Sequence, residues 1–171
     1  MSPDMVFEES NVRFNFSGAV WATKSLHDHY RICSNSLLKD VDFIVETQGE
    51  IFFVEIKNSA YAGARCPEVF EGEKIKTDKH CQDIAGKYYH SVLYPLVSRK
   101  EKKYIYLYVL ETTSRVDRTS RKLIRDKIIK YLPRKFPCMP EGSKSLIDEF
   151  DIVSIDEWNR KYSQYPITRL Y

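Results

Sequence analysis

The chain has 171 residues, of which 43% are hydrophobic and 30% charged, a composition typical of globular domains. No apolar run approaches the roughly 20 residues that a membrane-spanning helix needs, and the chain begins with an acidic, polar segment rather than an apolar one. We therefore expect a cytoplasmic protein with no membrane partner. The length suits one domain, and we expect it to cover residues 1–171.

The net charge of +3 is unevenly distributed along the chain. Residues 99–135 hold 13 Lys or Arg against four acidic residues, a net charge of +9, so the remainder carries −6. A local excess of this size suits an anionic partner such as a nucleic-acid backbone, although a solvated helix face has the same composition. The candidate nucleic-acid-binding residues in this segment are Arg118, Arg121, Lys122 and Arg125.

Residues 12–21 are expected to begin with a short strand, and the apolar spacing in residues 19–38 predicts a helix. Residues 41–58, VDFIVETQGEIFFVEIKN, predict two strands joined by a tight turn. Gln48 and Gly49 are the expected turn residues, with glycine supplying the positive φ of a primed turn.

The second part of the chain alternates between helix and strand. The apolar spacing in residues 77–97 predicts a helix with Thr77 or Asp78 as its N-cap. Residues 102–112 predict a strand, whose tyrosines could stack on bases or pack under a helix. The last elements are a helix over residues 117–132 with Leu123 and Ile124 inside, and a strand and helical turn over 150–162. This order predicts an α/β fold with a mixed β-sheet flanked by helices on both faces.

The turn at Gln48–Gly49 fixes which hairpin residues face one another. Ile44 then lies opposite Phe53 and Asp42 opposite Glu55, with Lys57 two residues further along the same face. Two opposed carboxylates destabilise a sheet, and a divalent cation would offset that cost, because Mg²⁺ is usually held by one or two carboxylates. The alternative is a salt bridge from Lys57 to one of the acids at an exposed strand end.

Asp42, followed after twelve residues by Glu55-Ile56-Lys57, resembles the core of the PD-(D/E)XK nuclease superfamily, the restriction-endonuclease-like fold. The resemblance covers about residues 20 to 110, although Val41 stands where the family usually has proline. It implies that Asp42, Glu55 and the backbone carbonyl of Ile56 bind Mg²⁺, for which Mn²⁺ can substitute. It also implies that Lys57 orients the attacking water and stabilises charge on the phosphate.

Further candidates come from other segments. Many members of the superfamily add an acid from the first helix, and Asp28 is the candidate for that catalytic role, with an exposed surface acid as the alternative. Glu8 and Glu9 would replace it if the start of the chain folds over the site. Lys87, on the helix over residues 77–97, could bind a phosphate or be a surface charge. The four cysteines lack the spacing of an iron–sulfur site, and we expect no such cluster.

Together these features predict a Mg²⁺-dependent nuclease acting on DNA rather than RNA. A homodimer would suit the cutting of both strands. The alternatives are a catalytically silent module that binds nucleic acid or another partner on the same fold, and a phosphoesterase acting on a nucleotide. The basic segment favours a polymer over a nucleotide.

Overall fold

The computed structural model describes residues 5–24, 26, 28, 38–64, 76–98, 101–112, 118–132 and 145–171. The strands are β1 (Val6–Glu9), β2 (Val12–Asn15), β3 (Trp21–Thr23), β4 (Phe43–Glu46), β5 (Glu50–Asn58), β6 (Lys103–Glu111), β7 (Glu149–Val153) and β8 (Ile167–Arg169). The helices are α2 (Asp78–Ser91), α3 (Leu93–Val97), α4 (Arg118–Ile129) and α5 (Ile155–Lys161).

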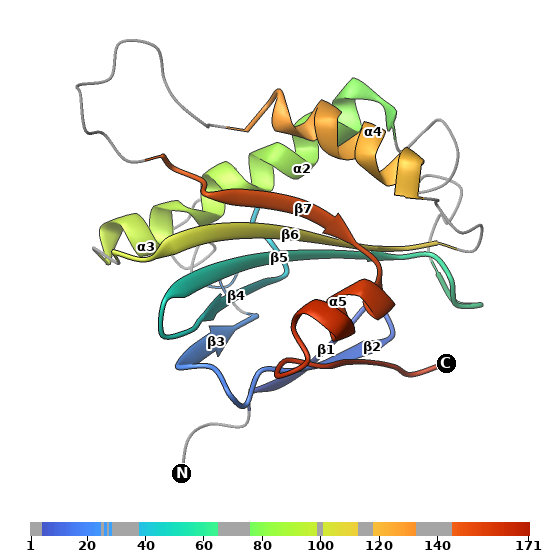
Figure 1. Cartoon of the computed structure of the whole chain (residues 1–171), viewed down its shortest axis with the longest axis horizontal. Helices are drawn as coiled ribbons and strands as arrows, with labels where there is room; N and C mark the ends of the chain where they lie inside the picture. The colour runs from blue at the N-terminus through green and yellow to red at the C-terminus, as the bar shows by residue number, and fades with distance from the viewer. Residues whose placement is uncertain are drawn as a thin grey trace.

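The main sheet has the strand order β3-β4-β5-β6-β7. Its first three strands are antiparallel neighbours, whereas β5, β6 and β7 run parallel and end at the same edge. Helices α2 and α4 cover one face, and α5 with the small sheet β1-β2-β8 covers the other (Figure 1). The predicted α/β class with a mixed sheet is confirmed. No helix in the described part of the chain is long and apolar enough to cross a membrane.

The core beneath α2 and α4 contains the tyrosine row of β6. Helix α2 begins after Thr77, whose side chain accepts a hydrogen bond from the His80 N–H, and it buries Ile84 and Tyr88 at helical spacing. The Tyr106 hydroxyl donates to the Ile84 carbonyl at 2.9 Å. The three tyrosines of β6 are thus buried in this core, and packing under a helix, rather than base stacking, accounts for them.

The core on the opposite face is built from aromatic side chains. Phe14 packs against Phe43 with ring centroids 4.6 Å apart and meets Trp158 edge-on at 6.0 Å. Trp158 lies in α5, which begins with a capping box between Ser154 and Glu157. Both faces of the central strands are therefore buried, so charge at the end of β5 is placed inside the protein.

The hairpin register is confirmed, but the turn differs from the prediction. Ile44 lies opposite Phe53, yet neither Gln48 nor Gly49 has φ in the left-handed region, so the turn is not of the primed type. The Thr47 side chain closes it instead: its Oγ1 accepts from the Glu50 N–H at 3.0 Å and donates to the Glu50 carbonyl at 3.1 Å.

Other predictions for local structure were wrong. Residues 21–23 form the edge strand β3 rather than helix, while residues 25, 27 and 29–37 of the predicted first helix lie outside the described part of the chain. Leu123 was expected inside α4 but is 54% exposed, because Ile124 and Ile128 form the buried stripe. The predicted short strand is β2, but its partner β1 and the hairpin turn at Ser10 and Asn11, which both have positive φ, were not predicted.

Candidate active site

Glu55 is the centre of the candidate site. It lies in β5, the middle strand of the main sheet, and its side chain has no exposed surface. The Lys57 Nζ lies 2.5 Å from Glu55 Oε1, and the Lys87 Nζ, on α2, lies 2.8 Å from both carboxylate oxygens. Two ammonium groups thus offset the cost of burying one carboxylate.

Asp42 lies beside this cluster, just before β4. Continuing the hairpin register places it opposite Glu55, and its Oδ2 accepts a hydrogen bond from the Ile56 N–H at 2.7 Å. Burial, and then the charge of Glu55, raises the pKa of Asp42 from 3.8 to about 7, against the opposing effect of Lys57 and Lys87. Asp42 is therefore partly protonated near neutral pH, and a cation at the site would favour its ionised form.

Lys57 remains a cation in this environment. Burial disfavours its charged form, but the charges of Glu55 and Asp42 outweigh burial and raise the pKa of Lys57 above its usual value. A lysine held in this state cannot act as a general base at neutral pH. It can stabilise negative charge that develops on a nearby group.

Two neutral groups border the cluster on the helix side. Tyr108 pairs with Glu55 across the parallel strands and is buried, and its hydroxyl lies 3.3 Å from His80 Nε2. Burial, and then the charge of Lys57, lowers the pKa of His80, so its ring is neutral at neutral pH. His80 and Lys87 are seven residues apart, two turns of one helix face, a spacing that could have indicated both residues as neighbours of the site.

A pocket of about 660 Å³ opens beside Lys57 and is also lined by residues of the β1–β2 turn. Asn58 Nδ2 donates to the Ser10 carbonyl at 2.9 Å, which holds this turn against the end of β5. Glu9 lines the pocket and raises the pKa of Lys57, while its own carboxylate pairs with Lys24 at 2.9 Å. The start of the chain thus reaches the site, as the alternative involving Glu9 required.

Asp28 lies elsewhere. Asp28 has helical backbone conformation and is exposed to solvent. Within the described residues, no three His, Cys, Asp or Glu side chains lie close enough together to hold a metal ion, so Asp28 does not form a group with Asp42 and Glu55. Its catalytic role stays a prediction that the geometry does not favour.

The predicted Mg²⁺ site depends on two carboxylates, and both oxygens of one of them, Glu55, contact lysines in this structure. Asp42 and Glu55 offer carboxylate oxygens, and Mg²⁺ is commonly bound by one or two carboxylates completed by water and phosphate oxygens. A structural zinc site needs four ligands that include Cys or His, and the described part of the chain brings no such set of side chains together. The raised pKa of Asp42 reflects two acids in one buried place, which a dication would stabilise.

The remaining predicted residues lie in two places. Lys87 belongs to the site itself, where its side chain is 23% exposed and paired with Glu55, rather than to the open surface. The basic residues of α4 line a separate cleft beside β7. Of the cysteines, Cys81 is buried with its thiol free, and the other three lie outside the described residues.

Comparison with protein-family models, curated proteins and solved structures finds no match to this chain. The functional argument therefore depends on the geometry and charge of the site.

Proposed function

We propose that this protein is a metal-dependent nuclease that hydrolyses phosphodiester bonds of nucleic acid, DNA in preference to RNA. The observation that supports this most is the fully buried Glu55 carboxylate between two lysines, beside a second carboxylate whose pKa is raised. Holding one fully buried and three partly buried ionisable groups together costs stability relative to apolar packing. A catalytic role for these groups would explain why the protein keeps them together despite this cost in stability.

The charges suit a phosphodiester substrate. With both acids ionised, Asp42 and Glu55 balance Lys57 and Lys87, so the site is neutral by itself. Asp42, Glu55 and the Ile56 carbonyl would hold Mg²⁺, which when bound supplies the Lewis acid for phosphodiester hydrolysis. The site would then carry two positive charges toward an anionic substrate.

Each residue has a distinct task in this proposal. Asp42 gives up its proton so that both carboxylates can act as ligands. Lys57 keeps its charge and stabilises the negative charge that develops on the phosphate. Lys87 approaches Glu55 from the helix side and donates hydrogen bonds to both of its carboxylate oxygens.

Cleavage assays test the proposal directly. Purified protein is incubated with end-labelled linear DNA, circular single-stranded DNA, circular duplex DNA and RNA, each with Mg²⁺, Mn²⁺ or EDTA. We expect cleavage with either metal and none in EDTA. The circular substrates separate endonuclease from exonuclease activity. Binding of DNA with no cleavage under any of these conditions would instead support a silent binding module.

A further inference from the structure

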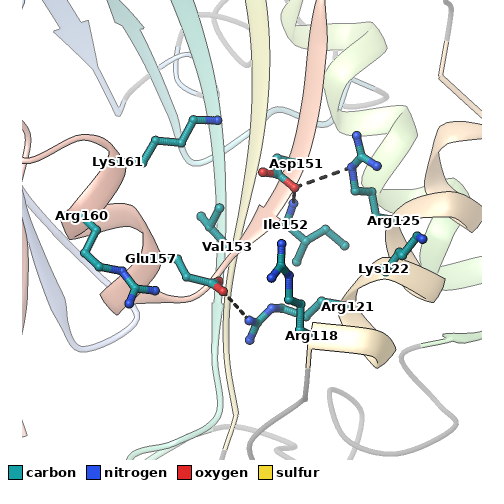
Figure 2. Close-up of a pocket in the computed structure, with 10 residues that line it drawn as sticks. All are labelled: Arg118, Arg121, Lys122, Arg125, Asp151, Ile152, Val153, Glu157, Arg160 and Lys161. Carbon is teal, nitrogen blue, oxygen red and sulfur yellow. Dashed lines mark hydrogen bonds and ion pairs between the residues drawn. The ribbon is translucent and has the colours of Figure 1, made fainter.

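A basic cleft of about 690 Å³ lies between α4 and α5, beside the outer strand β7 (Figure 2). Helix α4 forms one wall and α5 the other, and β7 forms the floor between them. The cleft is lined by six basic side chains, two acids and two apolar residues: Arg118, Arg121, Lys122, Arg125, Arg160, Lys161, Asp151, Glu157, Ile152 and Val153. Its lining therefore carries a net charge of +4.

Both acids of the cleft are already engaged by the protein. Glu157 accepts a hydrogen bond from Arg121 at 2.6 Å, which joins the two walls. Asp151 lies 3.6 Å from Arg125 Nε and accepts from the Ile152 N–H at 2.9 Å. These pairs account for the dashed contacts in Figure 2.

Three exposed cations form no ion pair among the described residues: Arg118 and Lys122 on α4, and Arg160 on α5. Arg118 and Lys122 are four residues apart on one helix face, where like charges repel and destabilise the helix. An anion bound between the two walls of the cleft would lower this cost, because it would attract the cations on both sides. Arg121, Arg125 and Lys161 are ion-paired within the protein, to Glu157, Asp151 and Glu149. The other three cations are the ones that suit an external anion.

The cleft and the carboxylate site lie at the same end of the main sheet. Glu55, Tyr108 and Ile152 are in register across β5, β6 and β7, and Ile152 lines the cleft. Neighbouring strands are about 4.8 Å apart, so the floor of the cleft begins roughly 10 Å from Glu55 along this row. That separation is about three nucleotides at the rise of roughly 3.4 Å per nucleotide of one strand.

We propose that the cleft between α4 and α5 binds backbone phosphates of the nucleic acid a few nucleotides away from the bond that the carboxylate site cleaves. This inference rests on the proposed function and adds to it the position of the substrate. The α5 wall, with Arg160 and Lys161, is the part that lies outside the basic segment 99–135. The cleft thus selects polymers over single nucleotides, because a nucleotide whose phosphate lies at the carboxylate site has no second backbone phosphate to place in the cleft.

The first test measures binding in EDTA, where no cleavage interferes. The cleft variant Lys122→Gln/Arg160→Gln removes one cation from each wall, and the matched control Lys103→Gln/Lys130→Gln removes two exposed cations elsewhere. Anisotropy of a fluorescent duplex is measured over a range of salt concentrations. The cleft variant should bind at least roughly tenfold more weakly, with a log–log salt slope shallower by about 1.8. The control should follow the wild-type protein, and equal loss in both variants would overturn the proposal.

The second test separates the cleft from the chemistry. Thymidine 5′-(4-nitrophenyl phosphate) is a diester with a single phosphate and none to place in the cleft, so wild-type protein and the cleft variant should hydrolyse it at the same rate. On long DNA the variant should show a raised KM and an unchanged kcat. A lowered kcat on the small diester would overturn the proposal, and so would unchanged KM on DNA.

The two proposals fail separately. If the wild-type protein cleaves no substrate, the proposed nuclease function fails, while the salt slopes in EDTA still decide whether the cleft binds phosphates. If the cleft variant loses binding to phosphatidylserine vesicles but keeps binding to DNA, the cleft recognises a membrane surface and the inference is wrong. Circular dichroism of both variants checks that these exposed substitutions leave the fold intact.

Discussion

The Lys87 Nζ atom on α2 lies 2.8 Å from both carboxylate oxygens of Glu55 on β5. This contact joins the helix to the centre of the main sheet at the point where the sheet carries its buried charge. It makes the packing of α2 and the ionisation of the site depend on one another, so stability and activity can both be measured on the same residues.

Replacing Lys87 with methionine should destabilise the protein, because Glu55 would keep only one of its two ammonium partners while remaining buried. Breaking a buried ion pair costs about 3 kcal/mol. Urea unfolding in EDTA measures the loss. Lys79→Met, at an exposed position of the same helix, is the matched control and should cost less than about 0.5 kcal/mol. Equal losses in the two variants would show that the Lys87 contact contributes nothing specific.

Asp42→Asn should change how stability depends on pH. The Asp42 pKa is about 7 in the folded protein and 3.8 in the unfolded chain. Between these values the folded state holds a proton that the unfolded chain has released, so the wild-type protein loses stability as pH rises from about 4 to 7.

Asparagine has no carboxyl proton to release, so the variant escapes this loss. The difference in free energy of unfolding between the variant and wild type should therefore shift in favour of the variant by about 2–4 kcal/mol from pH 4 to pH 7. Urea unfolding in EDTA at several pH values measures the difference. Asp28→Asn, at an exposed aspartate, should run parallel to wild type. If the free energy of unfolding of Asp42→Asn changes with pH in the same way as that of wild type, the raised pKa assigned to Asp42 is refuted.

The catalytic roles predict three inactive variants that differ in metal binding. Asp42→Asn, Glu55→Ala and Lys57→Ala should each abolish DNA cleavage, since each removes a group with its own task. Calorimetry with Mn²⁺ should show weakened binding for the two acid variants and unchanged binding for Lys57→Ala. Full activity in any of the three would refute the site.

Asp28 and Glu9 can be compared directly as candidates for an additional acid. Asp28→Asn should leave turnover within roughly twofold of wild type, the effect of a neutral surface substitution. Glu9→Gln should lower turnover, because Glu9 lines the pocket beside Lys57 and interacts with its charge. A strong Mg²⁺-dependent loss in Asp28→Asn, partly restored by Mn²⁺, would reverse this order and support the first-helix acid.

The turn of the β4–β5 hairpin predicts different effects on stability at two of its positions. Thr47→Val removes both hydrogen bonds between the Thr47 side chain and Glu50, at a cost of about 1 kcal/mol. Gly49→Ala should cost nothing measurable, because a Cβ there meets no atom within 4 Å and φ is not left-handed. Thermal unfolding of both variants measures this. A large loss in Gly49→Ala would indicate a primed turn after all.

The sequence was sufficient for the hairpin register, because the position of the turn at Gln48–Gly49 sets which residues pair and a slip by one residue would turn the apolar face outward. It was also sufficient for the α2 cap at Thr77, since capping is a local interaction. Lys87 and Glu9 could not be assigned in this way. Their places depend on how α2 and the β1–β2 hairpin pack against the sheet, and packing between distant segments leaves no local periodicity.

Side chains from α4 and from β7 itself bind backbone groups of the outer strand β7. Arg125 Nε donates to the Phe150 carbonyl at 3.0 Å, and the Asp151 carboxylate accepts from the Ile152 N–H. Exposed strand edges invite another chain to add a further strand and so begin aggregation. Because these two backbone groups are occupied, β7 is a poorer template for a further strand, and Arg125, which helps to make the cleft basic, also protects this edge of the sheet.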